Sequence, residues 1–288
     1  MRVILFVATN FALMIVLSIV CAVLGVDSDT TAGLVTLSLV FGMGGAVISL
    51  LMSKMIAKWT TGAKVINGSE NEQAQWLVRT VDELSRQANV RMPEVAIYPG
   101  EPNAFATGAF RNSALVAVST GLMQGMSRQE VRAVLGHELG HVANGDMVTM
   151  TLLQGVLNSA VILLSRVIGS VVDSAISGDS RNRRGPGLGY YLTYYVMQIL
   201  LGLLASMIVM AYSRRREYAA DASASRYLGS PTDMIRALQR LGSMTPGALP
   251  ESMKAFGISG RASWAHLFSS HPPLEARIKR LQQSQIVL

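Results

Sequence analysis

Four long apolar stretches limit what this chain can fold into. They cover about residues 3–26, 32–53, 147–172 and 190–212, and the first of them carries no charged residue. A helix needs roughly 20 consecutive apolar residues to cross the hydrocarbon core of a bilayer. Only 15% of the residues are charged, against about a quarter in an ordinary soluble domain. The pattern predicts an integral membrane protein with about four transmembrane helices.

The distribution of basic residues predicts the orientation of these helices. Arg2 precedes the first stretch and Lys54 follows the second, whereas the connection between the two contains Asp27 and Asp29 and no Lys or Arg. Basic flanks tend to stay on the cytoplasmic side. We therefore expect residues 54–146 to lie in the cytoplasm of a multi-pass protein.

The connection between the third and fourth stretches does not fit this rule. It contains Arg181, Arg183 and Arg184, although two full crossings would place it outside. Either this outer loop tolerates the charges, or the third and fourth stretches only dip into the membrane; the sequence leaves both open. The net charge of +7 forms no long basic run with interleaved aromatics, so nucleic acid is not an expected partner.

The polar regions predict a mainly α-helical fold with a small β-sheet. Residues 70–89 have an amphipathic helical pattern, and the segments EVAIY (94–98) and ALVAVS (114–119) have the composition of short strands. The loop between these strands contains PNAFATGAF, residues 102–110. We expect a zincin-like catalytic domain assembled from residues 54–146 and 213–288, with membrane helices in residues 1–53 and 147–212.

The strongest chemical signal is the segment HELGH, residues 137–141, within a helix whose start is marked by Ser127 and Glu130. The spacing places His137 and His141 on one helix face, where both imidazoles can bind one zinc ion. Glu138 follows the first histidine directly, so its carboxylate can accept a proton from a water molecule at the metal. The pattern predicts a metallopeptidase with one Zn²⁺ per chain.

A catalytic zinc ion usually has three protein ligands and one open position. The residues themselves leave the third ligand undecided between His266, His271 and the carboxylates that follow residue 212. A structural zinc site would favour four protein ligands, usually including Cys. The only cysteine, Cys21, lies in an apolar stretch, so a catalytic site is favoured.

At this point the chain resembles the HtpX family of membrane zinc peptidases, which is related to the CAAX prenyl proteases. The resemblance extends over essentially the whole chain and rests on four motifs in order, namely NAF at 103–105, HELGH at 137–141, EYAAD at 217–221 and HPPLEAR at 271–277. It implies that Glu217 is the third zinc ligand and that Asp221 orients a ligand histidine. Asp146 follows HELGH closely, and the sequence assigns it no role.

The resemblance also implies residues that contact substrate. His271 and Arg277 match positions near the substrate carbonyl, where His271 would take part in catalysis. Asn103, Ala104 and Phe105 match an edge-strand motif along which an extended substrate lies. Backbone pairing of this kind binds peptides with little regard to their sequence.

The implied function is an endopeptidase that cleaves misfolded or damaged membrane proteins at the cytoplasmic face of the bacterial inner membrane. Its implied partners are the lipid bilayer and these substrates; the oligomeric state is not readable. Two alternatives stay open, namely a CAAX-type prenyl-protein protease and a membrane scaffold or transporter with a structural metal. A protease that cuts within the bilayer is disfavoured, because the polar segment SRQEVRA, residues 127–133, precedes HELGH.

Overall fold

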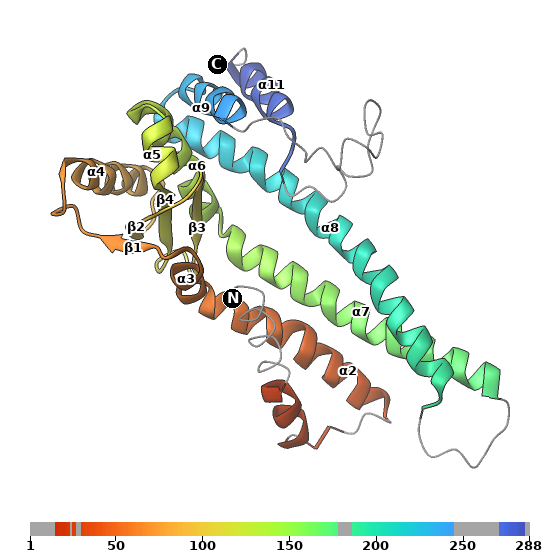
Figure 1. Ribbon diagram of the computed structural model, residues 1–288. Helices are drawn as coiled ribbons and strands as arrows, with labels where there is room; N and C mark the ends of the chain where they lie inside the picture. Colours follow the sequence, from red (N-terminus) through yellow and green to blue (C-terminus); the bar gives the residue numbers. More distant parts are fainter. Residues whose placement is uncertain (1–14, 24, 27–29, 178–185, 245–270, 286–288) are drawn as a thin grey trace. The chain divides into compact units, whose positions relative to one another are not determined.

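The computed structural model describes residues 15–23, 25–26, 30–177, 186–244 and 271–285 (Figure 1). The chain is mainly helical with one small sheet, as predicted. It divides into two compact units, one formed by Met1–Ser49 with Met150–Val209 and the other by Leu50–Thr149 with Met210–Leu288. The expected loop arginines 181, 183 and 184 lie outside the described residues, and so does His266.

Three helices of the described chain are long and apolar enough to cross a membrane. The first runs from Thr31 to Thr61 and consists of α2 (Thr31–Leu39), the π-helical turn η1 (Val40–Gly44) and α3 (Gly45–Thr61). The other two are α7 (Asp146–Ser177) and α8 (Leu188–Leu228). Most of the first predicted stretch lies outside the described residues, although residues 15–23 are helical. The number of four spans therefore stays a prediction.

Small residues bring two of these helices together within the first unit. A Cβ atom added at Gly42 of η1 would overlap Ser159 of α7, and one at Gly155 would lie 2.7 Å from the sulfur of Met43. Close approach at Gly and Ser is a common way for helices to pack in lipid, where van der Waals contact replaces the hydrophobic effect.

The second unit is built around a four-stranded sheet of order β1-β2-β4-β3. The strands are β1 (Lys64–Ile66), β2 (Glu94–Tyr98), β3 (Ala104–Thr107) and β4 (Leu115–Ser119). β2 and β4 are parallel, whereas β1 and β3 are antiparallel to their neighbours. This order places β3 at an edge of the sheet.

The helices of this unit are α4 (Glu72–Gln87), α5 (Thr120–Gly125), α6 (Arg128–Asn144), α9 (Thr232–Met244) and α11 (Leu274–Gln285). The main core joins Leu77 of α4, Val116 of β4, Leu135 of α6 and Leu238 of α9, all fully buried. A smaller cluster around Tyr98 and Leu115 includes Phe105 at its margin. The core fixes α6 against the sheet, which positions the candidate site.

Three details differ from the expectation. The residue pattern predicted a loop at 102–110, but this segment contains strand β3, as the edge-strand motif at 103–105 implied. The short strand β1 was not predicted. Helix α8 extends beyond the fourth predicted apolar stretch, which ends at residue 212, and has 41 residues without a break. Nothing in residues 210–217 interrupts helical hydrogen bonding, because this segment contains neither Gly nor Pro.

Candidate active site

Helix α6 holds the HELGH segment in a fixed register. At its start the Ser127 hydroxyl accepts a hydrogen bond from the Glu130 backbone N–H, and the Glu130 carboxylate accepts one from the Ser127 N–H. At its end Gly145 adopts a left-handed conformation, with φ of 69°. The helix is therefore defined at both ends by local sequence, and His137 and His141 share one face as predicted.

Gly140 on α6 has no side chain, and this lets α8 approach α6 closely. A Cβ atom added at Gly140 would lie 3.1 Å from the carbonyl oxygen of Ala220 and 3.2 Å from its Cα. These backbone atoms have little freedom to move, so the contact requires glycine. Ala220 lies between Glu217 and Asp221 on α8, and the close approach brings both carboxylates to the histidines.

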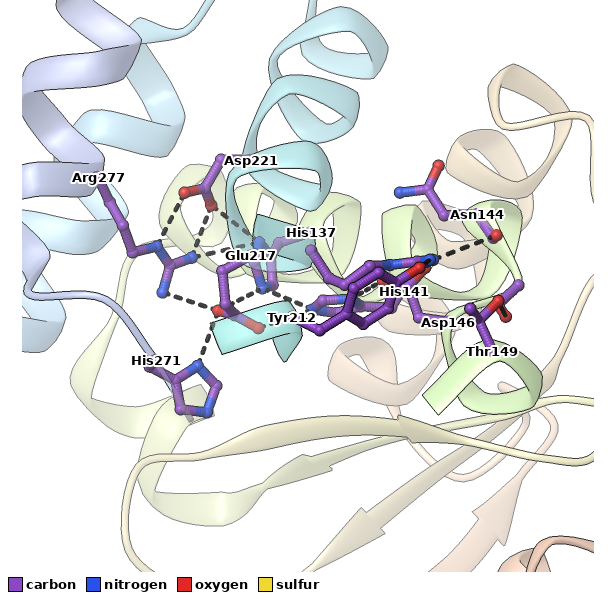
Figure 2. A network of polar contacts seen from close by, with 12 residues as sticks. His137, His141, Asn144, Asp146, Thr149, Tyr212, Glu217, Asp221, His271 and Arg277 are labelled. Carbon is purple, nitrogen blue, oxygen red and sulfur yellow. Dashed lines mark hydrogen bonds and ion pairs between the residues drawn. The ribbon is translucent and has the colours of Figure 1, made fainter. Parts of the chain in front are cut away.

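Three ligand atoms converge between the two helices (Figure 2). The Nε2 atoms of His137 and His141 are 3.1 Å apart. The Glu217 carboxylate lies 3.2 Å from Nε2 of His141 and 3.6 Å from Nε2 of His137. Within the described chain this is the group of His, Cys, Asp and Glu side chains able to hold a metal ion.

The other nitrogen of each imidazole is held by a carboxylate. Nδ1 of His137 is 2.9 Å from Asp221, and Nδ1 of His141 is 2.6 Å from Asp146. Each Nδ1 therefore donates its proton to a carboxylate, and the lone pair of each Nε2 is directed at the shared point. Two nitrogens bound to one tetrahedral zinc ion at about 2.0–2.1 Å lie roughly 3.3 Å apart. The donor set and its spacing fit zinc.

Glu138 lies beside these three residues but is not one of the potential metal ligands. Burial raises the pKa of its carboxyl group above the ordinary value, while the charges of His137 and His141 and a hydrogen bond from the Ala106 backbone N–H oppose that rise. The bond from Ala106 joins the carboxylate to edge strand β3. A carboxylate with a raised pKa at this position is suited to accept and return a proton.

Charged groups surround Glu217 closely. Its carboxylate is 2.7 Å from Nδ1 of His271 and 3.3 Å from the guanidinium of Arg277. Burial acts to raise the pKa of Glu217, but hydrogen bonds from His141 and His271 outweigh it and hold the pKa well below the usual range. Glu217 is thus ionised, the form in which a carboxylate binds metal.

Arg277 is buried and makes two hydrogen bonds to Asp221, of 2.8 Å from Nε and 2.6 Å from Nη2. Burial acts to raise the pKa of Asp221, and its bonds to Arg277 and His137 more than reverse this. The guanidinium therefore keeps Asp221 charged and oriented behind His137.

A cavity of about 420 Å³ opens onto the site. Its lining includes His137, His141, Glu138 and Glu217. It also includes the residues predicted to contact substrate, namely Asn103, Ala104, Phe105, His271 and Arg277. Strand β3 forms one wall. The Phe105 ring packs on Tyr98 with ring centroids 5.4 Å apart, so this side chain also belongs to the sheet.

Two further residues support the site and were not predicted to do so. Asp146 is buried, binds His141, and forms an ion pair with Arg216 of α8. Arg216 also donates to the Asn144 carbonyl at the end of α6. The nearness of Asp146 to HELGH was visible in the sequence, but its partner Arg216 follows the fourth apolar stretch and only the fold brings the two together.

The chain was then compared with known proteins. The family model described as peptidase family M48 matches residues 71–285. The chain belongs to this family. Three similar relatives carry the name "Protease HtpX homolog". That from Leptothrix cholodnii is 56% identical over 98% of this chain and 99% of its own, that from Bordetella pertussis 55% identical over 99% of each, and that from Acidovorax ebreus 54% identical over 99% of each.

Among solved structures, the crystal structure of S. mikatae Ste24p is similar, with a TM-score of 0.68 and 18% identity. The alignment covers 97% of this chain and 64% of Ste24p. At this identity the likeness concerns the fold alone. Family and relatives together confirm the resemblance to HtpX proteins: the chain is a membrane-bound metallopeptidase.

Proposed function

We propose that this protein is a zinc-dependent endopeptidase that cleaves misfolded or damaged membrane proteins at the cytoplasmic face of the bacterial inner membrane. The observation that supports it best is the convergence of His137, His141 and Glu217 beside Glu138, which is not a ligand. Three ligands plus an adjacent carboxylate are typical of a hydrolytic centre. We propose one zinc ion per chain.

Residues of the chain carry the proton transfers. Glu138 accepts a proton from the water that attacks the scissile carbonyl and delivers it to the amine of the leaving chain. When bound, the metal would polarise that water and the substrate carbonyl. Asp221 and Asp146 keep their histidines in the tautomer that binds metal.

Strand β3 supplies the substrate-binding surface in this proposal. It pairs with β4 on one side and lies at the sheet edge on the other. An extended peptide that pairs with residues 103–105 would place a backbone carbonyl next to Glu138, because Ala106 of the same strand already bonds to that carboxylate. The side chains of Asn103, Ala104 and Phe105 line the same cavity.

His271 and Arg277 complete the cavity on the opposite side from β3. The exposed His271 side chain approaches Glu217, from where it can donate a hydrogen bond to the oxygen that becomes negative as the peptide bond breaks. Arg277 acts mainly by positioning Asp221 and Glu217, and its charge also favours that oxygen. The family resemblance implied that both residues help to stabilise this oxygen, but it did not imply the positioning role of Arg277.

The location of the site favours membrane-associated substrates. Helix α7 starts at Asp146, five residues after His141, and the apolar part of α8 ends near Tyr212, five residues before Glu217. The site thus lies within a few residues of segments long enough to enter a bilayer. Basic residues 214–216 follow the second of them, which favours the cytoplasmic side.

The test compares wild type with Glu138→Gln in detergent, measuring bound zinc and cleavage of unfolded casein. We expect both proteins to retain zinc and the variant to lose about 10²–10⁴-fold in rate. Equal cleavage by both proteins would show that the activity belongs to another site or a contaminant. A wild type that binds no supplied zinc would overturn the metal assignment.

No observation favours the two alternatives. A structural metal requires no carboxylate in the position of Glu138, and the four-ligand sites typical of structural zinc usually contain Cys. Similarity to Ste24p concerns the fold and gives no support for a prenylated substrate.

A further inference from the structure

The turn that joins β3 to β4 presents an aromatic and a basic side chain to the outside of the catalytic unit. Phe110 is 63% exposed, and Arg111 next to it is also exposed. Few other large apolar side chains of this unit are as exposed to solvent as Phe110. Such a pair at a loop tip is costly in water and typical of a contact with a membrane surface.

The tip is a defined turn. The Ser113 backbone N–H donates to the Phe110 carbonyl over 2.9 Å. Gly108 starts the turn with φ of 141°, and a Cβ atom there would lie 2.5 Å from the Ser113 carbonyl oxygen. Since only glycine fits, the chain crosses itself tightly at this point and projects residues 109–112 away from the sheet.

The end of the sheet that carries this turn also meets a helix with membrane character. Thr107 and Glu94 both lie at this end, each opposite Leu115. The Glu94 carboxylate binds Lys54 and Lys58 of α3, at 2.7 and 2.5 Å. The turn and the C-terminal part of α3 are thus neighbours, as Figure 1 shows.

That part of α3 carries an exposed apolar stripe that reaches its end. Leu51, Met55 and Trp59 recur at helical spacing and are 58%, 56% and 69% exposed. Tryptophan is enriched at the boundary between hydrocarbon and headgroups. Trp59 is therefore expected near the membrane surface, and Glu94 is tied to the same part of α3 through Lys54 and Lys58.

The start of α7 lies against the same turn. A small pocket is lined by Phe110 and Arg111 together with Gly145, Met147 and Val148. The apolar part of α7 begins at Met147. The end of one apolar helix and the start of another therefore lie near the turn, and both of these ends belong to the catalytic unit.

We propose that the turn at residues 108–113 is a membrane-docking element, with Phe110 inserted at the boundary between acyl chains and headgroups and Arg111 bound to lipid phosphates. The occupant is the lipid surface because α3, which carries the exposed apolar stripe, is bound to the same end of the sheet as the turn. The exposed charge of the turn is also complementary to anionic headgroups. The docked turn holds edge strand β3 close to the bilayer, where a chain leaving the membrane would reach it.

The experiment measures the depth of a label on the turn, and its outcome does not depend on peptidase activity. A nitroxide is attached at Asn112→Cys in a Cys21→Ser background, which leaves a single thiol because Cys21 is the only cysteine. Phe110 and Arg111 stay intact. The full chain is placed in nanodiscs of phosphatidylethanolamine and phosphatidylglycerol, and accessibility to oxygen and to a water-soluble nickel chelate is compared.

The matched control is a label at Glu101→Cys, an exposed position at the opposite end of the same sheet, beyond Tyr98. We expect the label at 112 to favour oxygen over nickel several-fold relative to the label at 101. Phe110→Asp combined with Arg111→Glu should return the label at 112 to the values found at 101, while the spectrum of the label at 101 shows that the fold is kept.

Three results would overturn the proposal. A label at 112 that is as open to the nickel chelate as the label at 101 places the turn in water. A label shielded from both reagents places the turn against protein, either a substrate or a second copy of the chain. A lipid-exposed label that the double variant leaves unchanged would assign docking to α3 alone.

Discussion

At the residue scale, a buried carboxylate lies behind each histidine of the proposed metal site. Asp221 and Asp146 are 2% and 5% exposed and each accepts the Nδ1 proton of one histidine. Each is itself held by an arginine, Arg277 or Arg216. Buried charges are tolerated when they are paired and hydrogen-bonded, so the metal site depends on these two arginines as well.

Replacing Asp146 by Asn should weaken metal binding about 10–100-fold, because the amide is a poorer acceptor for the His141 proton and no longer balances Arg216. The measurement is zinc occupancy in competition with a chelator of known affinity. Asp233→Asn on α9 is the matched control, since that side chain is partly exposed and is not among the residues that line the cavity. Unchanged zinc affinity in Asp146→Asn would remove the role assigned to this carboxylate.

At the element scale, glycines on α6 decide how close α8 can come. A Cβ at Gly140 would meet the Ala220 backbone at 3.1–3.2 Å, whereas one at Gly136 would meet Ala224 at 3.5 Å, an ordinary contact. The two positions are one helical turn apart on the same helix. They therefore separate the effect of helix spacing from that of helix propensity.

Gly140→Ala should lower the free energy of unfolding by about 1–3 kcal/mol through overpacking. The added methyl group should also displace Glu217 by up to about 1 Å, and this displacement should reduce the cleavage rate by up to about 10²-fold. Gly136→Ala should keep zinc and activity, with a gain of about 0.5–1 kcal/mol from helix propensity. Thermal unfolding measures the stability of each variant, and zinc content measures whether the site is kept. Equal behaviour of the two variants would contradict the spacing argument.

A second element-scale contact gives a pH dependence. Hydrogen bonds from Lys54 and Lys58 lower the pKa of Glu94 below its ordinary value of 4.5. A lowered pKa means that the bond stabilises the fold above the unfolded-state pKa, and that this stability is lost as pH falls through the folded-state pKa. Glu94→Gln should cost under about 1 kcal/mol at pH 7, since the carboxylate is 40% exposed.

Melting temperatures of wild type and Glu94→Gln, measured across a pH series, test this contact. The two curves should converge below pH 4.5 and separate above it. Glu83→Gln is a suitable control, because its pairing with Arg132 at 3.4 Å is longer and the carboxylate is 61% exposed. A gap between wild type and Glu94→Gln that widens as pH falls would reverse the sign and reject the argument.

At the scale of the whole molecule, the site joins segments that are distant in sequence. His141 and Glu217 are 3.2 Å apart, although both α7 and the apolar part of α8 lie between them. An even number of membrane crossings must therefore separate them, and α7 and α8 are two helices long enough to cross. A metal bound there would tie the HELGH helix to the C-terminal part of the chain.

Metal removal should consequently destabilise the catalytic unit. Zinc at 100 times its dissociation constant should add about 2.7 kcal/mol to the free energy of unfolding. The shift is measured as the difference in denaturation between zinc-loaded and chelator-treated protein. Glu138→Gln should show the full shift, because it keeps all three ligands, and His137→Ala should show little. A full shift in His137→Ala would mean that zinc stabilises the protein elsewhere.

The sequence by itself determined the features that depend on local pattern. Apolar run lengths predicted the helices at 32–53, 147–172 and 190–212, and the i, i+4 spacing with a capping box predicted the ligand face of α6. Family motifs pointed to Glu217 and Asp221 because they recur in a fixed order. These features can be predicted from one sequence because each depends on a few neighbouring residues.

Only the tertiary structure decided the features that depend on residues far apart in the chain. The pairing of Asp146 with Arg216, the engagement of Arg277 with Asp221, and strand β3 within a predicted loop all arise from contacts across many positions. β3 has four residues, too few for periodicity to identify, and is fixed by pairing with β4. Hydrogen bonds and burial between distant segments stabilise these arrangements. The local preference of a residue for helix or strand is too weak to predict them.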